Sequence, residues 1–254
     1  FAPFCDIREN WQMQIIDLRT ERQCTPIQID SAHPRFSWRV DTKEQNWYQE
    51  SYRIQVWKNC LGKKQCKVWD SGTVLSRAMS QIPYEGEPLK SDSCYSWTVE
   101  VKKEGGQAAV VSEEASFETA FYSDSEWNAE WITEPQNTYH LYRTEFKADD
   151  KIAKAKLYIC GLGHEECVIN GKLVTDAVME AGWTDYNKSC LYCAYDVSEL
   201  VTAGDNAICV KLGDGMYRVP GGRYVYFPRS YGDRKLLATL RIIYEDGRTQ
   251  EIST

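Results

Sequence analysis

The stretch Val168-Ile169-Asn170-Gly171-Lys172 decides the fold class of this 254-residue chain. Two apolar residues run directly into Asn-Gly, and both positions of the tight turn that Asn-Gly favours need positive φ, so the stretch predicts a β-hairpin. Short alternating strands broken by glycine turns surround it, from Ala155 to Asp233. These turns are crowded with Trp, Tyr, Asp, Asn and Arg, the side chains that grip a polyhydroxylated ligand.

The second half of the chain repeats this strand pattern. Apolar residues alternate with polar ones at 142–146, 155–159 and 208–212, and residues 236–244 form a long apolar strand. Alternation with a period of two places one face of each strand in a core. We therefore expect residues 123–254 to form an all-β, jelly-roll-like sandwich.

The first half carries strands at the spacing of another antiparallel sandwich, over residues 14–122. Its details resemble a fibronectin type III domain, because Trp38 lies on the second strand and the third strand opens Tyr52-x-Ile-x-Val. Tyr95 stands where such domains have a tyrosine corner, so its hydroxyl is expected to bond the backbone near Leu89. The fold class is therefore all-β, with two antiparallel β-sandwiches.

Composition and charge exclude several classes of partner. A net charge of −7 disfavours nucleic acid, whose phosphates require a basic face. No dense Lys or Arg run marks a membrane surface and no apolar run reaches bilayer length, so membrane insertion is not expected. Residues 1–13 show no periodic pattern and are expected to form an N-terminal arm that is not a signal peptide. Because a signal can be trimmed, the expected location is periplasmic or extracellular, with the cytoplasm as the alternative.

Ten cysteines are many for a chain of this length. Cys60 and Cys66 flank a short turn, where a hairpin disulfide could form. Cys190 and Cys193 make a CxxC pair, a spacing typical of redox chemistry or of half a zinc site. A zinc site needs a second pair or histidines at ligand spacing, and the three histidines are scattered. Buried free thiols that pack as small hydrophobes are therefore the favoured interpretation.

Six short motifs, taken in order, identify a family. They are Trp69-Asp70-Ser71-Gly72, Trp127-Asn128-Ala129-Glu130-Trp131-Ile132, Gly182-Trp183-Thr184-Asp185-Tyr186-Asn187-Lys188, Tyr195-Asp196-Val197, Leu212-Gly213-Asp214-Gly215 and Tyr231-Gly232-Asp233-Arg234. In this order they resemble the N-terminal region of bacterial α-L-rhamnosidases, and the second sandwich resembles the galactose-binding-like domain appended to many glycosidases. One position departs from the pattern, because the family's Asp-Gly-Trp-Tyr carries Met216 here.

The resemblance implies that catalysis belongs to an (α/α)6 barrel that follows these sandwiches in the family. Inverting glycosidases hold two carboxylates about 6.5–9.5 Å apart, and no helical-barrel segment is found up to Thr254. The chain alone is therefore expected to be inactive, as the accessory part of an enzyme that hydrolyses terminal α-L-rhamnosyl residues of plant or bacterial glycans. Its expected partners are a rhamnose-containing glycan and the C-terminal catalytic domain of the same polypeptide.

Two other functions stay open. One is a stand-alone carbohydrate-binding or adhesion module with no enzymatic domain, and the other is a scaffold without a ligand site. No cofactor is required. The resemblance implies calcium as an option in the second sandwich, since Asp, Asn and loop carbonyl oxygens suit that ion, but it assigns no metal ligands.

Polar and aromatic residues near strand ends could form a sugar pocket if their loops converge. The candidate ligand-binding residues are Trp183, Asp185, Tyr186, Asp214, Tyr217, Arg223, Tyr231 and Asp233. A deoxyhexose offers vicinal hydroxyls to carboxylates and Arg, and an apolar face with a methyl group to aromatic rings. The competing interpretation is that Asp185 and Asp214 only accept hydrogen bonds from turn backbone N–H groups.

Two further segments stand out in the second domain. His164-Glu165-Glu166 is expected in a turn, where two acidic residues are more often solvated than functional. The loop 218–229 is dense in aromatics, Gly and Arg. It is either a long hairpin folded on its own sandwich or a surface that reaches the catalytic domain or lines the sugar pocket.

Overall fold

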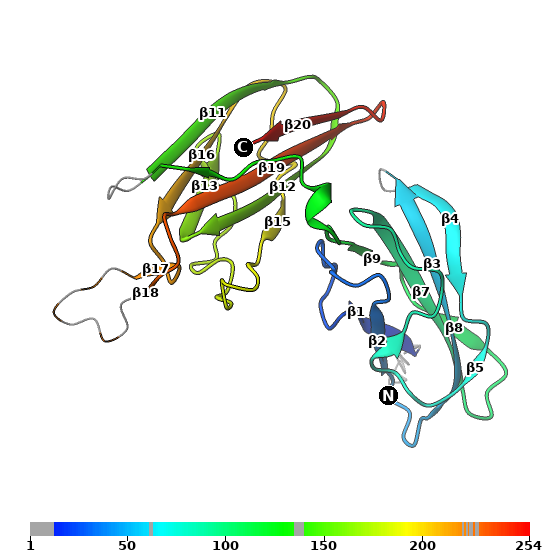
Figure 1. The fold of residues 1–254 in the computed structure, drawn as a ribbon. Coiled ribbons are helices and arrows are strands. Elements are labelled where there is room, and N and C mark those ends of the chain that lie inside the picture. The colour runs from blue at the N-terminus through cyan, green and yellow to red at the C-terminus, as the bar shows by residue number, and fades with distance from the viewer. Residues whose placement is uncertain are drawn as a thin grey trace, which may run out of the picture. The chain divides into compact units, whose positions relative to one another are not determined.

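The computed structural model describes residues 13–60, 63–134, 140–219, 221, 223, 226 and 229–254. The expected N-terminal arm, except for Met13, and half of the 218–229 loop lie outside these described residues. The chain divides into two compact units, Phe1–Tyr122 and Ser123–Thr254 (Figure 1). Each unit is all-β and antiparallel, as the alternating sequence pattern predicts.

The first domain is built from two sheets. Its strands are β1 (Gln14–Thr20), β2 (Arg35–Asp41), β3 (Gln49–Cys60), β4 (Lys63–Asp70), β5 (Val74–Leu75), β6 (Ile82–Pro83), β7 (Cys94–Lys103), β8 (Ala109–Val111) and β9 (Ala115–Glu118). One sheet has the order β1-β2-β6, and the other has the order β4-β3-β7-β8, with β5 paired to β3 and β9 paired to β7. The sheets bury an aromatic core that includes Trp97, Phe36 and Phe117.

The tyrosine corner is present in this domain. The ring of Tyr95 is buried and stacks on Phe117, with centroids 5.4 Å apart. Its hydroxyl accepts a hydrogen bond of 2.9 Å from the backbone N–H of Lys90, which confirms the prediction of a bond near Leu89. Trp38 packs edge-on against Tyr52 in the same core.

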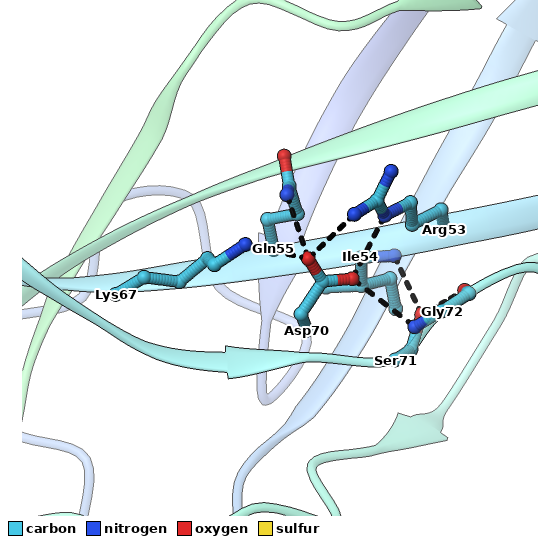
Figure 2. Close-up of polar contacts among 7 residues, drawn as sticks. All are labelled: Arg53, Ile54, Gln55, Lys67, Asp70, Ser71 and Gly72. Carbon is cyan, nitrogen blue, oxygen red and sulfur yellow. Dashed lines mark hydrogen bonds and ion pairs between the residues drawn. The ribbon is translucent and has the colours of Figure 1, made fainter.

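The Trp-Asp-Ser-Gly motif at the end of β4 is a structural clasp (Figure 2). The Asp70 carboxylate accepts two 2.8 Å hydrogen bonds from the Arg53 guanidinium on β3. It also accepts bonds from Gln55, Lys67 and the backbone N–H of Gly72. These donors, with Arg53 first, hold the pKa of the Asp70 carboxyl well below its ordinary value of 3.8. The motif therefore ties β4 to β3 and is not placed to bind a ligand.

The hairpin disulfide that the sequence allowed between Cys60 and Cys66 is not formed, because Cys66 is an exposed free thiol. The ladder explains why: Cys60 is paired with Lys63, whereas Cys66 is paired with Lys58. The register of β3 and β4 thus keeps the two cysteines from facing each other.

The second domain is a sandwich of two larger sheets. A short 3-10 turn, η1 (Asp124–Glu126), precedes strands β10 (Ile132–Thr133), β11 (His140–Ala148), β12 (Ile152–Leu162), β13 (His164–Ile169), β14 (Lys172–Leu173), β15 (Cys193–Asp196), β16 (Gly204–Gly213), β17 (Arg218–Val219), β18 (Arg229–Ser230), β19 (Lys235–Tyr244) and β20 (Thr249–Ser253). One sheet has the order β10-β19-β12-β15 with β20 on β19, and the other has the order β11-β16-β13-β14. A separate ribbon pairs β17 with β18.

The core of this domain lies between the two sheets. The inward faces of β12, β16 and β19 supply its aliphatic side chains, among them Leu157, Leu212 and Leu240. The Asn-Gly turn between β13 and β14 has the predicted conformation, with φ of 50° at Asn170 and 81° at Gly171. No helix of the described residues is long and apolar enough to cross a membrane.

Candidate functional site

Three loops of the second domain enclose a pocket of about 480 Å³. They follow β12, β14 and β16, which places them beside one another at one end of the sandwich. The pocket is lined by Gly163, His164, Met179, Glu180, Ala181, Gly182, Trp183, Tyr186, Gly213, Asp214, Gly215 and Met216. The Trp183 side chain is 64% exposed, so its ring is accessible at the pocket rim.

Five of the eight candidate residues gather around this pocket. Trp183, Tyr186 and Asp214 line it directly. The Tyr186 ring also lies 5.2 Å from the ring of Tyr217 and 5.2 Å from that of Tyr231, and the last two rings stack at 5.8 Å. Tyr217 is buried, and its hydroxyl donates to the Tyr231 carbonyl at 3.3 Å. These two tyrosines therefore support the pocket wall and do not line the pocket.

The other three candidates do not line the pocket. Asp185 accepts hydrogen bonds of 3.2 Å from the backbone N–H and the side-chain amide of Asn187, and it pairs with Lys188. Asp185 therefore accepts hydrogen bonds within its own turn, which is the interpretation that competed with ligand binding for this residue. Arg223 and Asp233 are exposed and lie outside the pocket lining.

Asp214 combines two roles. Its carboxylate lines the pocket and accepts a 2.9 Å hydrogen bond from Nη1 of Arg234, whose side chain is only 2% exposed. Arg218 lies 3.7 Å away on the same oxygen. Asp214 is thus the counter-ion of a buried guanidinium as well as a wall of the pocket.

The expectation for His164-Glu165-Glu166 is wrong, because these residues belong to β13 and not to a turn. Strand alternation sends the two acidic side chains to opposite faces. Glu166 points outward and pairs with Lys211 at 2.7 Å. Glu165 points inward and is 6% exposed, and neither of its carboxyl oxygens has a hydrogen-bond partner of normal geometry.

The environment of Glu165 makes its carboxyl unusual. Burial raises its pKa to about 7, nearby backbone N–H groups of Glu165 and Gly161 oppose this, and the charge of Glu180 adds to it. The oxygens fit only because residue 161 is glycine, since a Cβ there would lie 2.5 Å from Oε2 of Glu165. A second cavity of about 310 Å³ touches Glu165 and shares His164 and Glu180 with the first pocket.

Among the residues that the structure describes, no group of three or more His, Cys, Asp or Glu side chains is placed to hold a metal ion. An exposed indole can stack on the apolar face of a sugar ring, and the neighbouring carboxylates can accept hydrogen bonds from hydroxyl groups.

Family models match both domains. Residues 15–123 match the "Rha78A-like, N-terminal immunoglobulin domain", and residues 150–254 match the "Alpha-L-rhamnosidase N-terminal domain". An α-L-rhamnosidase of Streptomyces avermitilis is 36% identical, over 90% of this chain and 39% of its own length. One of Formosa agariphila is 29% identical, over 89% of this chain and 27% of its own length.

Solved structures agree with these matches. The α-L-rhamnosidase of Dictyoglumus thermophilum superposes with a TM-score of 0.82 at 32% identity, over 95% of this chain and 29% of that one. The enzyme of Aspergillus terreus superposes with a TM-score of 0.81 at 30% identity, over 96% of this chain and 29% of that one. The chain thus spans about a quarter to two fifths of the length of these relatives. By the succession of its two domains, the chain belongs to the domain families found at the N-terminus of α-L-rhamnosidases, an N-terminal immunoglobulin domain followed by an N-terminal domain.

Proposed function

We propose that this chain is the non-catalytic accessory part of an α-L-rhamnosidase that removes terminal α-L-rhamnosyl residues from plant or bacterial glycans. Relatives of that name are matched across both domains and extend well beyond the matched part. The carboxylates of the loop pocket are already engaged, because Asp214 binds Arg234 and Glu180 accepts from Cys193. Glycoside hydrolysis requires an acid and a base that are available to the substrate, so these groups fit a binding role better than a catalytic one.

The observation that carries a sugar-binding role is the loop pocket itself. Trp183 offers an exposed ring at its rim, and Asp214 and Glu180 offer acceptors inside it. Met179 and Met216 add apolar lining that suits the methyl group of a deoxyhexose. Met216 stands where the family pattern has Trp, so this chain would meet its ligand with a thioether at that position.

The same loops support a second part of the proposal, the docking of a catalytic domain of the same polypeptide. Several large apolar side chains are strongly exposed here: Val178, Met179, Trp183 and Leu191 are 83%, 74%, 64% and 50% exposed. A cluster of exposed apolar side chains marks an interaction surface. Ligand sites commonly lie at the junction of domains, so docking and sugar binding can share this end of the sandwich.

Titration of the chain with L-rhamnose, with and without calcium, tests the sugar site. We expect saturable chemical-shift changes in the indole signal of Trp183, and an affinity about tenfold lower in Trp183→Ala, the loss of about 1.4 kcal/mol of stacking energy. Trp131→Ala is the matched control, because Trp131 is a 40% exposed tryptophan of the same domain outside the pocket. Asp214→Ala is not a suitable test variant, since it would leave the buried Arg234 guanidinium without its counter-ion.

The outcomes separate the two parts of the proposal. Absence of any shift up to millimolar rhamnose would remove the sugar site and leave the docking role. Equal losses of affinity in Trp183→Ala and Trp131→Ala would place the site elsewhere. A gene that continues beyond the codon for Thr254 into a helical catalytic segment supports the docking role, and a stop codon there would contradict it.

A further inference from the structure

The second domain brings two cysteines together that are distant in the sequence. Cys160 is on β12 and is 2% exposed, whereas Cys190 lies in the segment before β15 and is exposed. The Cys160 thiol donates a hydrogen bond to the Leu191 carbonyl at a sulfur–oxygen distance of 3.0 Å. The Cys190 thiol lies within hydrogen-bonding reach of the same sulfur, so the single S–H of Cys160 has two alternative acceptors, the Leu191 carbonyl and Cys190. The two sulfur atoms are thus held side by side by β12 and the backbone at 190–191.

The two cysteines of the CxxC pair have different partners in this fold, although their spacing is typical of a joint site. Cys193 begins β15 and turns inward, where its thiol donates to Oε2 of Glu180 at 3.3 Å. Cys190 turns the other way, toward Cys160 and solvent. The expectation of buried thiols therefore holds for Cys160 and Cys193 and is wrong for Cys190, because the chain enters β15 only after it.

We propose that Cys190 is a site of thiol–disulfide exchange with low-molecular-weight disulfides such as oxidised glutathione, and that Cys160 is its resolving thiol. The Cys190 thiolate attacks one glutathione sulfur, and the glutathione disulfide bond breaks to release one glutathione thiolate. Cys160 then loses its proton and attacks Sγ of Cys190, which forms the protein disulfide and releases the second glutathione. Two protein thiols are oxidised, one glutathione disulfide is reduced, and two glutathione thiols are produced.

The electrostatics of the pair divide these roles. When the Cys160 S–H turns from the Leu191 carbonyl to the Cys190 sulfur, it stabilises the Cys190 thiolate and lowers the pKa of that thiol to about 7, against the opposing effects of burial and of the Asp124 charge. The pKa of the Cys160 thiol is raised, first by this hydrogen bond and then by burial, with Glu165 and Cys193 adding to the effect. Because thiolates and not thiols attack disulfides, Cys190 reacts first at neutral pH.

Formation of this disulfide would change the loop pocket. Cys190 follows the segment that carries Trp183 and Tyr186, two of the pocket-lining residues. A covalent link from Cys190 to β12 would anchor this segment to the sheet. This consequence depends on the pocket geometry and not on whether the pocket binds rhamnose.

Peptide mapping under non-reducing conditions tests the proposal. The reduced chain is incubated with millimolar oxidised glutathione at pH 7.5, quenched with N-ethylmaleimide and digested. We expect a Cys160–Cys190 cross-linked peptide and two glutathione molecules released for each cross-link formed. In Cys160→Ser the glutathione adduct should remain on Cys190, and in Cys190→Ser the Cys160 thiol should stay unreacted.

Cys24→Ser is the matched control, because Cys24 is another exposed free thiol, and it lies in the first domain. The cross-link should form in this variant at the wild-type rate. A stable glutathione adduct on wild-type Cys190, or a Cys190–Cys193 disulfide, would overturn the role of Cys160. Equal rates of adduct formation at Cys24 and Cys190 in the wild-type chain, which needs no folding of a variant, would overturn the special reactivity of Cys190.

Discussion

Glu165 is a buried acidic residue whose environment differs strongly from that of a free side chain. Its carboxyl lies in the sandwich interior against Gly161, and burial holds its pKa at about 7 where the ordinary value is 4.5. A carboxyl with a raised folded-state pKa stabilises the fold while it is protonated. Its contribution is complete below pH 4.5 and is lost as the pH rises to about 7.

We therefore predict that Glu165→Gln is more stable than wild type at pH 8, by an amount on the order of 3 kcal/mol at most. The difference should shrink steadily between pH 7 and pH 4.5. Urea unfolding of the two proteins across this range measures it. Glu166→Gln is the control, because the neighbouring Glu166 is exposed and paired with Lys211. A wild-type pH slope in Glu165→Gln would show that this carboxyl titrates normally.

At the scale of the element, one acidic side chain, that of Asp70, fastens the end of the edge strand β4 to β3. Asp70 gathers Arg53, Gln55 and Lys67 and so connects the end of β4 to β3 (Figure 2). Ser71 continues the clasp, since its hydroxyl accepts from the backbone N–H of Ile54 at 2.8 Å. Because the Arg53 side chain is 40% exposed, solvent screening reduces the strength of the ion pair.

We predict that Asp70→Asn destabilises the first domain by about 1–2 kcal/mol at pH 7. The pKa of the Asp70 carboxyl is lowered in the fold, so its contribution is present above the ordinary value of 3.8 and is lost as the pH falls through the lower folded value. The gap between wild type and variant should accordingly narrow below about pH 4. Thermal unfolding followed by circular dichroism measures it. Glu114→Gln, which removes a surface pair with Lys64, should change stability by less than about 0.5 kcal/mol, and an equal effect of both variants would contradict the clasp.

At the scale of the whole molecule, the chain carries two separate hydrophobic cores. One cluster, around Trp97, belongs entirely to the first domain, and the other, around Leu157, belongs entirely to the second. The compact units meet in sequence at Tyr122 and Ser123. Each core is thus complete within one continuous segment of chain.

We predict that residues 13–122 and 123–254 each fold when they are expressed alone. Each fragment should unfold cooperatively on heating, because its own buried side chains supply the cooperative core. Near-ultraviolet circular dichroism and calorimetry of the two fragments measure this. A fragment without a tertiary signal would show that its core needs the other domain.

Much of the fold was accessible from the sequence because strand patterns and turn chemistry are local. The Asn170-Gly171 turn, the Tyr95 corner and the all-β class each rest on a few neighbouring residues. The pocket was accessible in part, since aromatic and acidic residues near strand ends pointed to Trp183, Tyr186 and Asp214. The ion pair of Asp214 with Arg234 could not be predicted from the sequence, because Arg234 lies in a different loop and reaches Asp214 only in the folded chain.

The sequence by itself determined two all-β domains and their family, because side-chain alternation and the order of short motifs are properties of the chain. Only the tertiary structure decided which side chains are buried and which meet. Glu165 is buried because β13 already begins at His164, and alternation along this strand turns position 165 inward. Cys160 lies beside Cys190, and Cys193 lies beside Glu180. The packing of the strands, and not the spacing of the cysteines in the sequence, decides which side chain each thiol meets.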